Sequence, residues 1–131
     1  MPLLFTPDSP YKKRARFLAI LWTLLIFVGC LMPAANVPHV TVPLADKWVH
    51  FIFFGGFTFL WLCTPPSTRQ VNLCLVLALA IAYGTIIEVL QGVFTSLGRS
   101  CEVMDVVADS IGGVLGVLVF LIGARFSRKH M

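Results

Sequence analysis

Charged residues are scarce in this chain: they make up 12% of its 131 residues, whereas apolar residues make up 58%. Soluble domains are typically about 45–50% apolar and about 25% charged. A soluble fold of this length could not hide so much apolar surface from water. The scarcity of charge therefore excludes an ordinary soluble domain and predicts a single membrane domain with several spans.

The chain also lacks a basic stripe interleaved with aromatic residues, which a nucleic-acid-binding surface would need. Its formal net charge is +4, but most of the ten Lys and Arg residues lie near the two termini. Basic clusters beside apolar spans are what membrane topology requires. We therefore expect the lipid bilayer as a partner and no nucleic acid.

Signatures of several known chemistries are missing as well. The four cysteines include no Cys-x-x-Cys pair, no His-Glu-x-x-His metal signature occurs, and no serine lies in a nucleophile elbow. We expect no cofactor and no metal, and we interpret the cysteines as small apolar residues. A bridge between Cys30 and Cys101 is the alternative for two of them.

Four apolar runs predict the fold class: an all-α membrane protein, built as a four-transmembrane-helix bundle. The runs cover residues 17–32, 48–63, 71–93 and 103–123, and a membrane-spanning helix needs about 20 residues. Asp46 stands where the second helix would have its N-cap. The first run is interpreted as a retained helix, because no pair of small residues near Ala35 suits signal-peptide cleavage.

The distribution of basic residues predicts the orientation. The N-terminal segment holds four Lys or Arg residues, the 64–70 loop one and the C-terminal segment three, whereas Lys47 and Arg99 alone fall on the other side. The positive-inside rule therefore places both termini in the cytoplasm. The expected organisation is a cytoplasmic basic segment at 1–15, a four-helix membrane domain at 16–124 and a basic cytoplasmic tail at 125–131.

In this topology the strongly polar residues outside the tails gather at the outer membrane face. His50 lies about 6 Å and Glu88 about 8 Å below their helix ends, given a rise of 1.5 Å per residue. Ionisable groups inside a membrane are functional candidates by default. The predicted ligand-binding residues are Asp46, Lys47, His50, Glu88, Gln91, Arg99, Asp105 and Asp109.

Helical spacing brings several of these residues onto shared faces. Glu88 and Gln91 are three apart, and Asp105 and Asp109 are four apart. The alternative to a ligand site is an ion-pair network that only ties the helices together, with Arg99 bridging carboxylates. Gly112 and Gly116, also four apart, predict close helix packing within the bundle.

Acidic groups outnumber basic ones in this region, so the carboxylates cannot all stay ionised without compensation. Either protons are shared among them or a cation is bound, and we favour shared protons. His50, Glu88 and Asp105 are the candidates for catalytic proton transfer, although the catalytic residues, if any, stay unknown.

In this order and spacing, the residues resemble the VanZ-like family of small bacterial membrane proteins over roughly residues 15–124. The resemblance lies in Asp46-Lys47-x-x-His50-Phe51, Glu88-x-x-Gln91, Arg99, Asp105 and the pair Gly112 and Gly116. The family usually has Asn where this chain has Asp109, which adds a negative charge. The resemblance implies a bacterial inner-membrane protein of the cell envelope and a link to teicoplanin, a glycopeptide antibiotic.

Three functions remain open from the sequence. The leading hypothesis is a site that binds an envelope lipid or a lipid-linked cell-wall precursor, with Arg99 and Lys47 engaging a phosphate or carboxylate. The second is an intramembrane hydrolase or transferase acting on a lipid head group, with His50 as general base. The third is a structural or regulatory membrane partner whose polar residues only stabilise the bundle.

Overall fold

The structure, a computed structural model, describes residues 2–129, and all regular elements within that range are helices. This confirms the predicted all-α class. Short 3-10 turns precede the first helix and lie in two of the connections. The four α-helices are α1 (Lys12–Cys30), α2 (Ala45–Leu62), α3 (Gln70–Val93) and α4 (Val103–Lys129).

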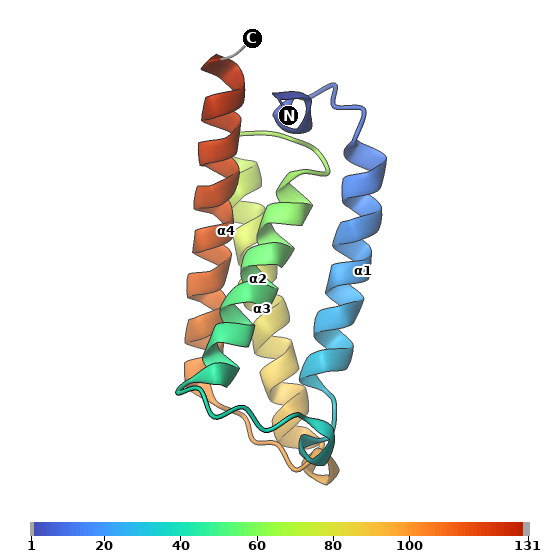
Figure 1. The fold of residues 1–131 in the computed structure, drawn as a ribbon, viewed down its shortest axis with the longest axis vertical. Helices are drawn as coiled ribbons and strands as arrows, with labels where there is room; N and C mark the ends of the chain where they lie inside the picture. Colours follow the sequence, from blue (N-terminus) through green and yellow to red (C-terminus); the bar gives the residue numbers. More distant parts are fainter. Residues whose placement is uncertain (1, 130–131) are drawn as a thin grey trace.

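The helices run up and down beside one another, so the chain reverses direction at each connection (Figure 1). Both termini and the short α2–α3 loop lie at one end of the bundle. The two longer connections, residues 31–44 and 94–102, lie at the opposite end, which we call the connector end. The arrangement therefore separates the basic termini from the region that holds the polar residues of interest.

The helix bounds agree with the apolar runs at α3 and at the start of α4, and differ most at the start of α1 and at the end of α4. α1 begins at Lys12, because Lys and Arg are good helix formers and continue the apolar run towards the N-terminus. α4 continues to Lys129, since basic residues are favourable near a helix C-terminus. Residues 130 and 131 of the predicted tail lie outside the described residues.

The predicted N-cap role of Asp46 is wrong. α2 begins at Ala45, and the N-cap position is Leu44, which has a left-handed backbone with φ of 57°. Asp46 instead lies in the first turn of α2, where a carboxylate is favourable beside the positive end of the helix dipole.

Two helices, α3 and α4, are long and apolar enough to cross a membrane by length and composition. α1 falls short because it begins with a basic run, and α2 because Asp46, Lys47 and His50 lie in its first turns. The candidate site residues in the first turns of α2 are thus the ones that lower its hydropathy.

Glycines bring α2 and α4 into backbone contact. A Cβ atom added to Gly112 would lie 2.7 Å from the carbonyl oxygen of Phe51, and one added to Gly55 would lie 3.2 Å from the carbonyl oxygen of Gly112. Gly116 faces the carbonyl of Gly55 in the same way. This approach fixes the register between α2 and α4, which carry most of the polar side chains described next.

Candidate functional site

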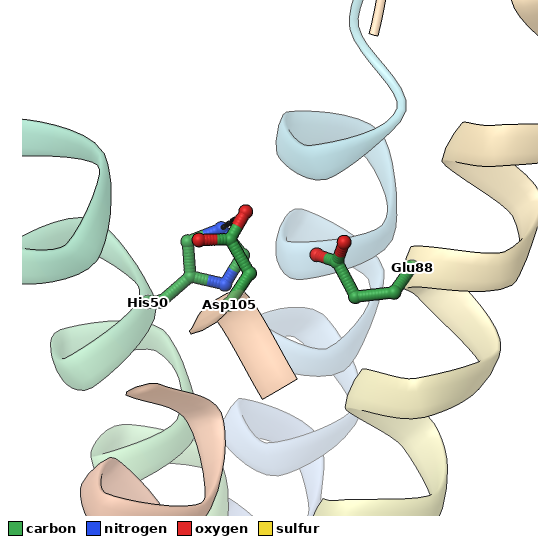
Figure 2. Close-up of side chains that lie close together, drawn as sticks. All are labelled: His50, Glu88 and Asp105. Carbon is green, nitrogen blue, oxygen red and sulfur yellow. Dashed lines mark ion pairs between the residues drawn. The ribbon is translucent and has the colours of Figure 1, made fainter. Parts of the chain in front are cut away.

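Four polar side chains from three helices meet near the connector end, and we call this group the polar pocket. His50 comes from α2, Glu88 from α3, and Asp105 and Asp109 from α4. Their exposed fractions are 6%, 1%, 7% and 1%, so all four are buried. Figure 2 shows His50, Glu88 and Asp105 facing one another across the space between their helices. The fold therefore brings together residues that lie up to 59 positions apart in the sequence.

An imidazole–carboxylate pair forms the centre of the polar pocket. His50 Nδ1 lies 2.6 Å from Asp109 Oδ1, within hydrogen-bond distance. If Nδ1 carries the proton and donates a hydrogen bond to Asp109, the neutral imidazole keeps a free lone pair on Nε2. That Nε2 lies 3.6 Å from Asp105 Oδ2. Gly84 on α3 leaves the room for this pair, since a Cβ there would overlap the Asp109 carboxylate.

Lys47 neutralises the side of the polar pocket nearest the connector end. Its ammonium donates to Asp46 at 2.7 Å, to Glu102 at 2.9 Å and to Asp105 Oδ1. Through its contact with Asp105, Lys47 joins α2 to the start of α4.

Glu88 is held from one side only. Its Oε2 accepts the backbone N–H of Glu102 at 2.9 Å, whereas its Oε1 is buried and has no hydrogen-bond partner among the described residues. The Oδ2 of Asp109 is likewise buried without a partner there. A buried polar atom left without a partner costs about 1–3 kcal/mol, and more when it is charged. The polar pocket therefore contains two buried carboxylate oxygens whose hydrogen-bonding capacity the described residues do not satisfy.

Gln91 and Arg99 hold the connector end together. Gln91 Nε2 donates to the carbonyl of Cys30 at 2.6 Å, and Arg99 Nε donates to the carbonyl of Met32 at 2.8 Å. The last carbonyls of a helix have no partner within the helix, so Gln91 stabilises the C-terminal end of α1, whereas Arg99 binds the connection two residues beyond that end. Within residues 2–129 Arg99 forms no ion pair with the polar pocket.

Arg99 also lines a groove at the connector end. The groove has a volume of about 410 Å³, and its walls are mostly apolar residues of the 31–44 connection, with Asp46 and His39 among them. Arg99 is half-buried, and only its Nε is engaged by the protein within the described part of the chain. Its terminal nitrogens are therefore free to bind an anionic group in the groove.

The structure thus divides the eight predicted residues into two sets. Lys47 and Asp46 join the polar pocket at its connector-end side, whereas Gln91 binds the end of α1 and Arg99 binds the connection just after it. Glu102 was absent from the predicted set, although its carboxylate binds Lys47 and its backbone N–H binds Glu88. Its acidic side chain, three residues before Asp105 in the sequence, was the signal that could have identified it. By contrast, no sequence pattern identifies the backbone carbonyls of Cys30 and Met32 as the partners of Gln91 and Arg99.

The four cysteines are free thiols, so the alternative Cys30–Cys101 bridge is wrong. Cys30 is buried and Cys101 exposed. The connector end is therefore held together by hydrogen bonds and by the ion pairs of Lys47, without a covalent link.

Comparison with models of known protein families gives a match to the family described as VanZ/LLP1, over residues 9–124. No curated protein and no solved structure matches the chain. The family match and the two apolar helices together indicate a membrane protein.

Proposed function

Because the chain belongs to the VanZ/LLP1 family, we propose that it is a multi-pass protein of the bacterial inner membrane that binds an envelope lipid or a lipid-linked cell-wall precursor. The binding site comprises the groove beside Arg99 and the polar pocket behind it. The observation that carries the proposal is the convergence of buried, incompletely bonded polar groups at the connector end. Through such binding the protein would alter susceptibility to teicoplanin.

The proposal includes four membrane spans with both termini in the cytoplasm, around a membrane domain at residues 16–124. Large apolar side chains are exposed on all four helices, including the more polar helices α1 and α2. Leu21 and Leu24 on α1 and Ile52 on α2 are each at least half exposed. A soluble protein would not leave apolar patches of this extent in water. The basic residues at the end that holds the termini support a cytoplasmic position for that end.

The groove suits an amphiphilic anion. Val37, Val40 and Val42 supply apolar walls, and Arg99 supplies a cation at the margin. A guanidinium binds phosphate or carboxylate through two parallel N–H donors. A lipid phosphate could therefore bind Arg99 while its acyl or prenyl chain stays in the apolar surroundings.

Replacing Arg99 with Gln tests the proposal. We expect binding of a lipid-linked precursor to protein in nanodiscs to weaken about tenfold or more, since a hydrogen bond to a charged group contributes about 1.5–3 kcal/mol. Arg69→Gln is the matched control, because Arg69 is an exposed cation at the opposite end of the bundle. Asp105→Asn and His50→Gln should also change binding and teicoplanin susceptibility. Unchanged binding and susceptibility in all three variants, at normal protein levels, would contradict the proposal.

One observation favours the second candidate, an intramembrane hydrolase or transferase acting on a lipid head group. The contact between His50 and Asp109 at 2.6 Å has the form of a general base oriented by a carboxylate. Ser110 is unsuited as its nucleophile, because its hydroxyl donates to the carbonyl of Val106 in its own helix. Turnover of a labelled lipid by the purified protein, lost in Glu88→Gln, would favour the enzyme, whereas no turnover across a broad lipid panel would favour binding alone.

A further inference from the structure

The donor atoms of His50, Glu88 and Asp105 are arranged for a ligand that all three can share. Each residue offers one donor atom, and the three atoms lie within 4.8 Å of one another. All three residues are buried. Figure 2 shows the Glu88 carboxylate pointing towards the imidazole of His50 and the carboxylate of Asp105. We propose that the polar pocket binds a single divalent transition-metal cation, of the Zn²⁺ or Mn²⁺ class, through these three side chains.

Each of the three residues is held on its outer side by a second group, which leaves one atom free. Asp109 binds His50 Nδ1, Lys47 binds Asp105 Oδ1, and the N–H of Glu102 binds Glu88 Oε2. The remaining atoms are the imidazole Nε2, the Asp105 Oδ2 and the unpartnered Glu88 Oε1. Outer partners of this kind orient metal ligands and fix the tautomer of a ligating histidine.

The unpartnered Glu88 Oε1 is a separate reason to expect a ligand. It belongs to a side chain that is 1% exposed and has no hydrogen-bond partner among the described residues. A shared proton would join two of the donor atoms, but it would leave the third uncompensated. A cation satisfies all three at once.

The distances and charges suit a cation of this class. Two ligand atoms bound to one tetrahedral Zn²⁺ ion at about 2.0–2.2 Å lie about 3.3–3.6 Å apart, and Nε2 of His50 is 3.6 Å from Oδ2 of Asp105. The three buried carboxylates oppose one ammonium, that of Lys47, and a divalent ion would balance the remainder. One imidazole with two carboxylates is a mixed nitrogen and oxygen set, which suits Zn²⁺ or Mn²⁺ better than Ca²⁺.

A second acidic group nearby shows the contrast. Asp46, Glu102 and Asp105 also offer three oxygens within 4.8 Å of one another, and Asp46 and Glu102 are exposed. The Lys47 ammonium already binds all three of these residues. The cation is therefore expected in the polar pocket and not among these three carboxylates.

The experiment is a titration of the full-length protein, stripped of metal with a chelator and held in detergent micelles. Zn²⁺ is followed by calorimetry and by metal analysis after gel filtration, and Mn²⁺ by electron paramagnetic resonance. We expect one equivalent bound per chain. Glu88→Gln and His50→Gln should each weaken binding by at least a hundredfold, and Asp109→Asn, which removes an orienting partner, by about 10–100-fold.

Two controls separate this site from adventitious binding. His39→Gln removes an exposed histidine in the connection, and Asp8→Asn removes an exposed carboxylate outside the polar pocket, so both variants should bind the metal as the unaltered chain does. Thermal unfolding supplies a readout that does not depend on lipid binding: added Zn²⁺ should raise the midpoint of the unaltered protein but not that of Glu88→Gln. Absence of binding, equal binding by Glu88→Gln, or loss of binding only in His39→Gln would overturn the proposal. None of these outcomes alters the lipid-binding test on Arg99.

Discussion

Replacing Lys47 with Met is expected to destabilise the protein by about 3–5 kcal/mol, because breaking a largely buried ion pair leaves uncompensated charge. The Lys47 side chain is 15% exposed and that of Asp105 11% exposed, and the ammonium also binds Asp46 and Glu102. Its removal leaves three carboxylates close together without a counter-charge. Chemical unfolding in detergent micelles, followed by circular dichroism, measures the loss.

Lys13→Met is the matched control for this substitution. Lys13 is exposed near the start of α1, so its replacement should change stability by less than about 0.5 kcal/mol. Combining Lys47→Met with Asp105→Asn should recover part of the loss, since the two residues interact directly. A cost for Lys47→Met no larger than that for Lys13→Met would show that the ion pairs of Lys47 do not stabilise the connector end.

Replacing Gly116 with Ala is expected to cost about 3 kcal/mol, the upper part of the range for overpacking. The added Cβ would overlap the carbonyl oxygen of Gly55 and would lie 3.0 Å from the Cβ of Thr58. The nearest atom belongs to the backbone of α2, so no side chain can move aside, and α2 must separate from α4. That separation should also pull His50 from Asp109 and weaken ligand binding.

Gly29→Ala provides the comparison for Gly116→Ala. Its added Cβ would lie 3.3 Å from the ring of Phe53, a side chain that can shift by a few tenths of an ångström. We expect a cost below about 1 kcal/mol, because a side-chain contact is more easily relieved than a backbone contact. Similar unfolding free energies for the two variants would contradict the close approach of α2 and α4.

Much of the fold could be predicted from the sequence, because apolar runs and proline-rich connections set the helices almost directly. The errors lie at helix ends. Asp46 resembles an N-cap, but the backbone of Leu44 adopts the left-handed turn and α2 begins one residue before Asp46. The charged residues after Gly123 stay helical, since their polarity ends the membrane-like pattern without ending the helix.

The polar pocket was only partly predictable. Helical spacing correctly places Asp105 and Asp109 on one buried face, because three- and four-residue intervals fix direction along a helix. Helical spacing does not predict the direction of side chains in an irregular connection. Arg99 was expected beside the carboxylates, yet it binds the carbonyl of Met32, and Lys47 supplies the cation instead.

The measurement that tests the central claim most directly is the thermal unfolding midpoint of metal-free Glu88→Gln. Gln keeps an oxygen that accepts the N–H of Glu102 and removes a negative charge from a buried atom without a partner. If the polar pocket is a ligand site, the midpoint of Glu88→Gln should equal or exceed that of the metal-free unaltered protein, while ligand binding is lost. If the polar pocket serves only to stabilise the bundle, the midpoint should fall by several degrees, and that result would contradict the account.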